Sequence, residues 1–356
     1  MPKISRKFLI VFLPLLLVLF LPLDTHSVPF ISQETEIAMG KGADEQITRQ
    51  YGIYQNKTLQ LYVNRIGQNL VSQLSDKVFP RYYFRIVDSS DINAFALPGG
   101  YVYVTLGLMA MVNSEAELAG VLGHEIGHII FHHGARQMVR SIGSQILALG
   151  GAIASPKNAG QWLTVSTAMF QQINMGYGRE AEIESDEQGI LNSMEAGYSP
   201  FGMSGFLKSL RRKEIMSGQA YHSFQASHPD TRDRIVKAGL LAGRMSDEEE
   251  DVNSYRSRYL HQIRGLKYKG QKHSGDKKRH EPMYIDIYEV QKGDTFQSIA
   301  EKEMGNRRKD LDITVMNGRK ESSQPKPGDL LKLVHKGKFK KDKFLHIKPK
   351  PTPDPK

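Results

Sequence analysis

The sequence predicts an α+β fold that is mostly helical, with a small sheet and a compact C-terminal module. Apolar residues recur at helical spacing over 32–75, from Ser114 onward and over 179–197. Two short β-branched and aromatic runs, at 82–87 and 101–105, stand on either side of a Pro-Gly-Gly turn and predict strands. The module near the C-terminus reads as strand, two helices and strand.

Each helix has its own signals. The first segment, 32–75, keeps apolar side chains at helix-like spacing. A second helix begins at Ser114, because a serine followed three positions later by Glu117 predicts a capping box. A third helix is expected to end at Gly197. Residues 141–178 are rich in small residues, and we expect a helical hairpin or a mobile lid there.

Length and composition limit the classes of protein. A chain of 356 residues with 40% hydrophobic residues can bury a full-sized core and has room for more than one domain. It contains no cysteine, which excludes disulfides, lipid-modified cysteines and thiolate metal ligands. A metal site would therefore use histidine and carboxylate side chains.

The N-terminus has the pattern of a secretory signal. Lys3, Arg6 and Lys7 precede an apolar run over 8–23, which is short for a bilayer span and contains two prolines. We expect residues 1–27 to be a signal peptide, with an uncleaved N-terminal anchor as the alternative. In both cases we expect an exported protein of the periplasm or cell envelope.

Composition divides the rest of the chain. We expect a main domain at 28–245, a charged linker at 246–282, the compact module at 283–335 and a basic Lys/Pro tail at 336–356. Residues 252–282 of the linker, with nine basic and two acidic residues, and the tail, with eight and two, are strongly basic within a chain of formal net charge +10. They are expected to be solvated or to contact an anionic membrane surface. We do not expect an exported chain to bind nucleic acid.

The motif GHEIGH, residues 123–128, contains candidate metal ligands and a candidate general base. Positions four apart on a helix lie on one face, so His124 and His128 present their imidazoles to one point and can bind one zinc ion. Glu125 is offset around the axis and can reach a water at the metal without replacing a ligand. This arrangement is typical of a hydrolase in which zinc lowers the pKa of water and a carboxylate takes its proton.

A catalytic zinc needs a third protein ligand. Among the acids of the 179–197 helix, Glu182 and Asp186 share a face, and Glu180 and Glu184 point away from it. We expect Glu182 to be the ligand and Asp186 to orient a histidine ligand through its second nitrogen. For any one of these acids alone, a solvated helix face is the alternative.

Two further histidines test this geometry. His132 lies about 12 Å along the helix axis from His124, which is too far to share an ion with Zn–N bonds of about 2.1 Å. We expect His132 and His133 to cap the helix, to line the site or to support the ligands from behind.

These residues resemble the BepA/HtpX-like zinc metallopeptidase family, in which HExxH is followed by Glu-x-x-x-Asp. NAFALPGG at 93–100, GREAEIESDEQG and SHPDTRDRI strengthen the resemblance, which covers about residues 32–240. It implies a mostly helical zincin domain with a small β-sheet. By the same resemblance, His124, His128 and Glu182 bind one Zn²⁺ and Glu125 is the general base.

The resemblance also assigns residues around the zinc. His228 would lie near the open coordination position, where it stabilises the oxyanion or blocks the site in a resting state, and Arg234 would support this region. Asn93, Ala94 and Phe95 would form an exposed edge strand that pairs with extended peptide substrates. An ordinary edge strand without substrate contacts is the alternative.

Residues 283–335 resemble a LysM domain. YEVQKGDTFQSIA opens the stretch, Asn317 lies in its middle and QPKPGDLLKLV closes it, and the order of elements is βααβ. LysM domains bind N-acetylglucosamine polymers, so the resemblance implies a tether to peptidoglycan. A protein-contact or spacer role is the alternative.

Three functions are compatible with these features. The first is an exported zinc endopeptidase that cleaves misfolded or damaged envelope proteins. The second is a peptidoglycan peptide hydrolase, and the third is a non-catalytic envelope chaperone or scaffold. The intact base and ligand set argue against the third, and the resemblance favours protein substrates over wall peptides.

Overall fold

The computed structural model describes residues 32–138, 176–217, 222–229, 231–246, 252–268, 282–320, 322–337 and 339. The predicted signal peptide, most of the predicted hairpin or lid, and nearly all of the basic tail lie outside these ranges. Among the described residues, no helix combines the length and the apolar character that a bilayer crossing requires.

The N-terminal helical segment consists of two helices, α2 (Gln33–Tyr51) and α3 (Lys57–Ser72), where the sequence predicted a continuous one. Gly52 ends α2 with a φ of 73°, a left-handed conformation that glycine adopts without strain. Asn56 begins α3, because its side chain accepts a hydrogen bond from the backbone N–H of Leu59. The prediction missed this break because the apolar spacing continues across it.

The N-terminal sheet contains β1 (Tyr83–Val87), β2 (Ala94–Leu97) and β3 (Tyr101–Thr105), in the order β1-β3-β2. Both strands predicted around the Pro-Gly-Gly turn are present, and they pair in parallel. The turn itself joins β2 to β3, which pair antiparallel. Among the described residues β2 lies at the edge of this sheet, as predicted, but its four residues are buried, whereas an exposed edge was expected.

The helix α5 (Glu115–Ile130) carries GHEIGH in its second half. Ser114 begins it as predicted, accepting a hydrogen bond of 3.0 Å from the backbone N–H of Glu117. Glu117 reaches one residue further back than in a capping box, because its Oε2 accepts a 2.7 Å hydrogen bond from the backbone N–H of Asn113. The short helix α4 (Leu106–Met111) separates the sheet from α5.

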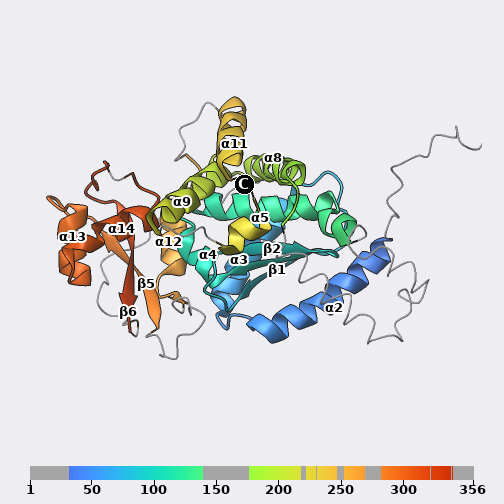
Figure 1. Cartoon of the computed structure of the whole chain (residues 1–356), viewed down its shortest axis with the longest axis horizontal. Coiled ribbons are helices and arrows are strands. Elements are labelled where there is room, and N and C mark those ends of the chain that lie inside the picture. The colour runs from blue at the N-terminus through green and yellow to red at the C-terminus, as the bar shows by residue number, and fades with distance from the viewer. Residues whose placement is uncertain are drawn as a thin grey trace, which may run out of the picture.

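Different helices cover the two faces of the sheet (Figure 1). Successive side chains of a strand point to opposite faces, so Phe95 and Leu97 pack in one cluster with Met39 and Ile47 of α2. The side chains of Ala94 and its same-face neighbours join the main core with α3 and α5. The GHEIGH motif thus lies on a helix that is held against the sheet.

Four more helices complete this part of the fold: α8 (Arg179–Glu195), α9 (Gly202–Ser217), α10 (His222–Ser227) and α11 (Thr231–Met245). α8 and α9 contact α5 on the side away from the sheet, and α11 contacts α8 and α9 (Figure 1). The predicted α+β class, mostly helical with a small sheet, is confirmed.

The predicted charged linker is partly a folded element. It contains the helix α12 (Arg256–Ile263) and the strand β4 (Lys267–Tyr268). Tyr259 and Leu260 of α12 are completely buried in the main core. The sequence did not predict this short amphipathic helix, because its three apolar residues in eight give a weak periodic signal within a basic segment.

The C-terminal module follows the predicted order of strand, two helices and strand. Its elements are β5 (Met283–Glu289), α13 (Phe296–Met304), the 3₁₀ helix η2 (Arg307–Lys309), α14 (Asp310–Met316) and β6 (Leu330–Lys336). β5 pairs antiparallel with both β4 and β6, which makes a second three-stranded sheet. The module lies at the opposite end of the molecule from α2 (Figure 1).

The module is joined to the rest of the fold through a shared core and through Lys332. Ile285 and Ile287 of β5 belong to the main hydrophobic core. The buried Lys332 ammonium donates hydrogen bonds of 2.8–2.9 Å to the carbonyls of Ala110, Met111 and Val112, at the C-terminus of α4. A cation suits this position, because the last carbonyls of a helix lack intrahelical partners.

Candidate metal centre

Small residues bring α5 and α8 into close contact. A Cβ atom built on Gly123 would lie 2.8 Å from the carbonyl oxygen of Gly189, and one on Gly127 would lie 2.9 Å from the Cα of Ser185. Only glycine fits at such backbone approaches. The two helices can therefore place side chains from both on one metal-sized volume.

We expect Gly189→Ala to disturb this arrangement. Its Cβ would meet the backbone nitrogen of His124 at 2.6 Å, so the two helices must separate. Overpacking of this kind costs about 1–3 kcal/mol, measurable by urea denaturation, and should weaken metal affinity as well. Gly239→Ala on α11 is the matched control, since nothing lies within 4 Å of its Cβ. A Gly189→Ala protein with unchanged stability and metal affinity would show that the contact does not set the geometry.

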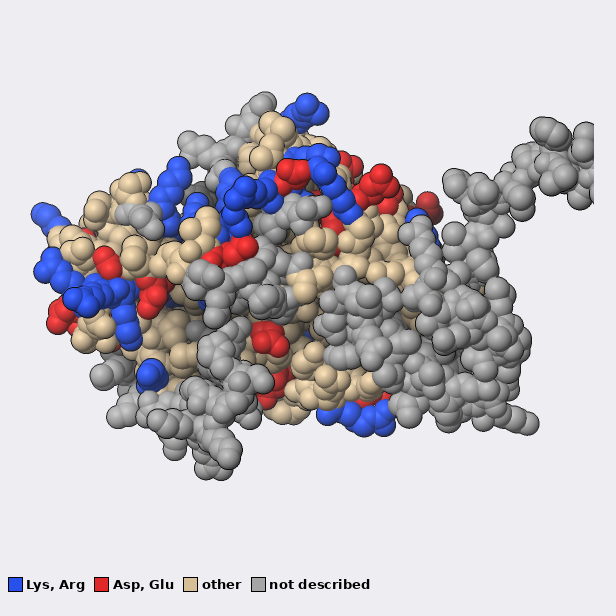
Figure 2. Space-filling view, viewed as in Figure 1, with Lys and Arg blue, Asp and Glu red and all other residues tan. Residues whose placement is uncertain are grey.

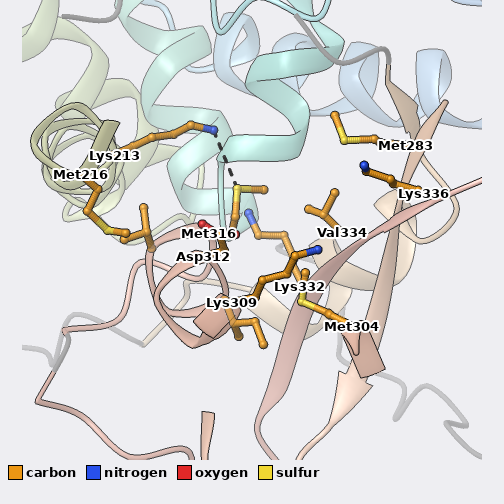
Figure 3. Close-up of a pocket in the computed structure, with 12 residues that line it drawn as sticks. Lys213, Met216, Met283, Met304, Lys309, Asp312, Met316, Lys332, Val334 and Lys336 are labelled. Atoms are coloured by element: carbon orange, nitrogen blue, oxygen red, sulfur yellow. Dashed lines mark hydrogen bonds between the residues drawn. The ribbon is translucent and has the colours of Figure 1, made fainter. Parts of the chain in front are cut away.

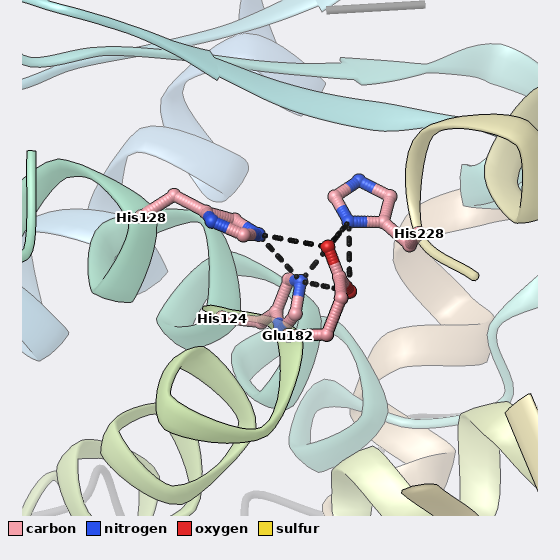
Figure 4. Close-up of side chains that lie close together, drawn as sticks. All are labelled: His124, His128, Glu182 and His228. Atoms are coloured by element: carbon pink, nitrogen blue, oxygen red, sulfur yellow. Dashed lines mark hydrogen bonds and ion pairs between the residues drawn. The ribbon is translucent and has the colours of Figure 1, made fainter. Parts of the chain in front are cut away.

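Four buried side chains converge on one point (Figure 4). Donor atoms of His124, His128, Glu182 and His228 all lie within 4.8 Å of one another. The two histidines of the motif face each other through their Nε2 atoms at 3.0 Å. The carboxylate of Glu182 lies 3.4 Å from Nε2 of His124 and 3.5 Å from Nε2 of His128. The three residues predicted as ligands are thus together.

The spacing of these donors suits a zinc ion. Two ligand atoms at about 2.1 Å from a tetrahedral zinc are roughly 3.4 Å apart, which is close to the distances among His124, His128 and Glu182. His228 occupies the remaining corner, with its Nδ1 3.2 Å from His124 Nε2 and 3.1 Å from Glu182 Oε1. A set of imidazole nitrogens and a carboxylate is also the chemistry that zinc prefers.

Asp186 and Arg234 lie directly behind the cluster, as predicted. The Oδ1 atom of Asp186 is 2.8 Å from Nδ1 of His124. The guanidinium of Arg234 donates to both carboxylate oxygens of Asp186, at 2.7 and 2.8 Å, and lies 2.6 Å from Glu182. Burial alone would raise the carboxyl pKa values, but the charges of His228 and Arg234 hold the pKa of Glu182 well below its usual value, and that of Arg234 lowers the pKa of Asp186.

Burial and the nearby charges also give the two histidines of the motif different pKa values. Burial lowers the pKa of His124, but the charge and hydrogen bond of Asp186 outweigh burial and raise that pKa to about 9. Burial and the nearby charge of His124 lower the pKa of His128 well below its usual value. The ring of His128 is therefore a neutral nitrogen donor, which is the form that binds metal.

A second chain of contacts supports His128. Its Nδ1 lies 2.9 Å from Nδ1 of His133, whose Nε2 lies 3.0 Å from Glu184. The ring of Tyr177 stacks on His128 at 4.1 Å between centroids. His133 was predicted only as one of several kinds of support, and Tyr177 was missed. A lone tyrosine between two glycines gives no sequence signal for such a contact.

Glu125 is the one acid of the site without a hydrogen-bonding partner in the described part of the chain. Its side chain is 0% exposed, and neither carboxylate oxygen accepts a hydrogen bond there. Burial raises its pKa above the usual value, against the lowering effect of the His228 and His124 charges. Its Oε1 lies 3.5 Å from Nε2 of His228. A buried, unsatisfied carboxylate is costly and points to a functional role.

The edge of β2 lies against His228. Its Nε2 is 3.4 Å from the carbonyl oxygen of Ala94, and the hydroxyl of Ser227 donates to Oδ1 of Asn93 at 3.2 Å. Phe95 points to the opposite face of the sheet and stacks on Tyr103, with centroids 5.0 Å apart. Of the three predicted substrate-binding residues, Asn93 and Ala94 adjoin the cluster, whereas the side chain of Phe95 lies on the other face of the sheet and its backbone faces β3.

Two remaining features concern the surroundings of the cluster. His132 lies outside it and pairs with Glu36 at 2.7 Å, in line with the distance argument from the helix geometry. A cavity of about 10 Å³, bordered by His128 and Tyr177, has room for about one water molecule. This cavity does not admit a peptide, and the four clustered side chains are all buried.

Comparisons with known proteins agree with this geometry. The model of peptidase family M48 matches residues 57–239. The chain is 29% identical to the beta-barrel assembly-enhancing protease of Escherichia coli (strain K12) over 234 residues, which cover 63% of this chain and 47% of that protein. It is 31% identical to the protein of the same name from Yersinia pestis over 199 residues, covering 53% of this chain and 40% of that protein.

A mitochondrial metalloendopeptidase of Schizosaccharomyces pombe is 30% identical over 216 residues, which cover 58% of this chain and 61% of that protein. The chain thus spans about half the length of the bacterial relatives that it matches. The matched family region contains every residue of the buried cluster and more than half of the chain. We conclude that the chain belongs to peptidase family M48 and is a zinc metallopeptidase.

Proposed function

We propose that this chain is an exported zinc endopeptidase that cleaves misfolded or damaged proteins of the cell envelope. The observation that carries the proposal is the convergence of His124, His128 and Glu182 beside the buried carboxylate of Glu125, which accepts no hydrogen bond from the described residues. In this proposal the first three residues hold one Zn²⁺ and Glu125 is the general base.

Bound zinc supplies a Lewis acid that activates water and polarises the scissile carbonyl at neutral pH. Glu125 then accepts the proton of the attacking water and passes it to the leaving amine. Asp186 holds the ring of His124 through Nδ1, which keeps Nε2 turned toward the metal position. Arg234 balances the charges of Glu182 and Asp186, so that both remain ionised in a dry site.

We assign His228 to a resting state in which it blocks the fourth corner of the site. Its Nδ1 contacts Glu182 and His124, and its Nε2 faces the edge of β2. Withdrawal of Ser227 and His228 would free the metal position, the side-chain amide of Asn93 and the backbone carbonyl of Ala94. An extended peptide could then pair with β2, which recognises unfolded segments with little sequence demand. In the open state His228 would stabilise the oxyanion.

The location of the enzyme is also a proposal. The sequence of residues 1–27 supports export, and the name of the bacterial relatives links them to β-barrel assembly. The βααβ order of the C-terminal module supports a LysM-like domain that tethers the enzyme to peptidoglycan. Lysine and arginine side chains lie over this module, with acidic side chains among them (Figure 2), and with the basic tail they favour an anionic membrane surface.

The test separates the candidate functions. The zinc-loaded chain without residues 1–27 is incubated with unfolded casein and, separately, with purified sacculi. Casein cleavage supports the proposal, whereas release of peptides from sacculi alone would assign the chain to wall hydrolysis. Activity on neither substrate would leave a non-catalytic scaffold and would overturn the proposal.

The ligand assignment is tested by zinc content. We expect one zinc per chain in the wild type and a loss of bound zinc in Glu182→Ala after dialysis, measured by atomic absorption. Glu180→Ala is the matched control, because its side chain is exposed on the same helix. Full zinc content in Glu182→Ala would remove Glu182 from the ligand set.

We also expect His133→Ala to weaken zinc binding by roughly 10- to 100-fold, the usual cost of removing a group that orients a ligand. His133 is the contact of His128 Nδ1, and Glu184 fixes His133 in turn. Glu184→Gln should show a smaller loss in the same direction. Competition with a fluorescent chelator measures both. Equal affinities of all three proteins would show that His133 does not orient His128.

A further inference from the structure

A larger cavity lies between the end of α9 and the C-terminal module (Figure 3), and none of the clustered metal-centre residues lines it. Its volume is about 340 Å³, within the range of about 300–1,000 Å³ that small-molecule sites occupy. Lys213 and Met216 of α9 form one wall, and the module forms the others. The cavity therefore exists only where the two parts of the protein meet.

The walls are unusually rich in methionine. Met216, Met283, Met304 and Met316, four of the 14 methionines in the chain, come from four different elements and line this one cavity. Methionine is unbranched and flexible, so such a surface adapts to an apolar chain of variable shape. The lining predicts an aliphatic ligand rather than a rigid polar one.

The charged residues of the cavity are mainly cations. Lys213, Lys309 and Lys336 belong to three different elements, and Asp312 is the acid among the lining residues. Burial lowers the pKa of Lys213 despite the attraction of Asp312, so a further anion nearby would stabilise its charged form. The fourth lysine, Lys332, already donates to three carbonyls of α4 and is not needed for a ligand.

The cavity continues an existing interface. In the register of β5 and β6, Met283 pairs with Lys336 and Ile285 pairs with Val334. Residues two apart share a face, so Met283, Val334 and Lys336 extend the face whose Ile285 packs in the main core. The neighbouring sequences, residues 269–281 and 338–356, contain more lysine and arginine than acidic residues. Twelve lysines and arginines stand in these segments against four acidic residues, so their net charge is positive.

We propose that this cavity binds a single-chain anionic amphiphile, a fatty-acid carboxylate whose chain lies among the methionines and whose head group pairs with Lys309 and Lys336. This site is separate from the zinc site and does not depend on proteolysis.

Calorimetric titration of the full chain with fatty acids below their micelle concentrations tests the proposal. We expect decanoate to bind one per chain, and affinity to rise roughly fourfold for each methylene from octanoate to decanoate. Acetate has the head group alone and should not bind. Decanol has the chain alone and should bind roughly tenfold more weakly than decanoate. Decanol and decanoate of equal affinity would remove the anionic head group from the proposal.

Two variants locate the site. Lys309→Gln combined with Lys336→Gln should weaken decanoate binding roughly tenfold and leave decanol binding unchanged. Met216→Trp, at a partly exposed wall position, should block both ligands. Lys292→Gln is the matched control, since it removes one exposed charge from the same module outside the cavity. Equal losses in the control, no decanoate binding to the wild type, or self-association through this face instead would overturn the proposal.

Discussion

Replacing Glu125 by glutamine is expected to lower kcat for casein cleavage by roughly 10²- to 10⁴-fold, the usual contribution of a positioned general base. Glutamine matches glutamate in shape but cannot accept the proton of the attacking water. Zinc content should stay at one per chain, because Glu125 is not among the clustered donors. Steady-state kinetics and metal analysis of the same preparation measure both quantities.

The stability of Glu125→Gln gives a further check. The buried carboxylate has no hydrogen-bonding partner in the described ranges, so its neutral replacement should not reduce the free energy of unfolding. A variant that is as stable as the wild type, fully loaded with zinc and still fully active would refute the assignment of the base. Glu180→Gln, on the exposed face of α8, is the matched control and should keep its activity.

Replacing Arg234 by methionine is expected to have the largest effect on stability. Arg234 is 1% exposed and contacts Asp186 and Glu182 through charged hydrogen bonds. Removing one partner of a buried ionic network leaves uncompensated charges and costs about 3–5 kcal/mol. Urea denaturation of the metal-free protein measures this loss directly.

Zinc binding should reduce the loss of stability that Arg234→Met causes. A bound cation would replace part of the lost positive charge, so the difference between Arg234→Met and the wild type should shrink when zinc is added. Arg232→Met, two positions earlier and exposed, should change stability by no more than about 0.5 kcal/mol. Equal effects of the two replacements would show that the buried network does not stabilise the fold.

Much of the site could be predicted because it depends on the periodicity of two helices. Four-residue spacing placed His124 beside His128, and it placed Glu182 on the same face as Asp186. Helical spacing also excluded His132, which pairs with Glu36 instead. The contact between α5 and α8 was not predictable in this way, because glycines at a helix contact look the same in sequence as glycines at a surface.

The parts that the sequence did not predict depend on contacts between distant segments. Tyr177 stacks on His128, which lies 49 positions earlier in the chain, and the residues next to Tyr177 give no sequence signal for this contact. The helix α12 was hidden in a basic segment, although Tyr259 and Leu260 are completely buried. Charge density predicts where a chain is solvated on average, but a few apolar side chains decide whether it packs.

The ammonium group that closes the end of α4 has a consequence for how this architecture can change. Lys332 donates to Val112, only two residues before the capping serine of the active-site helix, so a pull on the C-terminal module is transmitted to the start of that helix. In the described part of the chain, the shared core and the Lys332 contacts pack the two parts together. We therefore expect that a C-terminal module from another protein can replace this one only if it keeps a lysine at the position of Lys332.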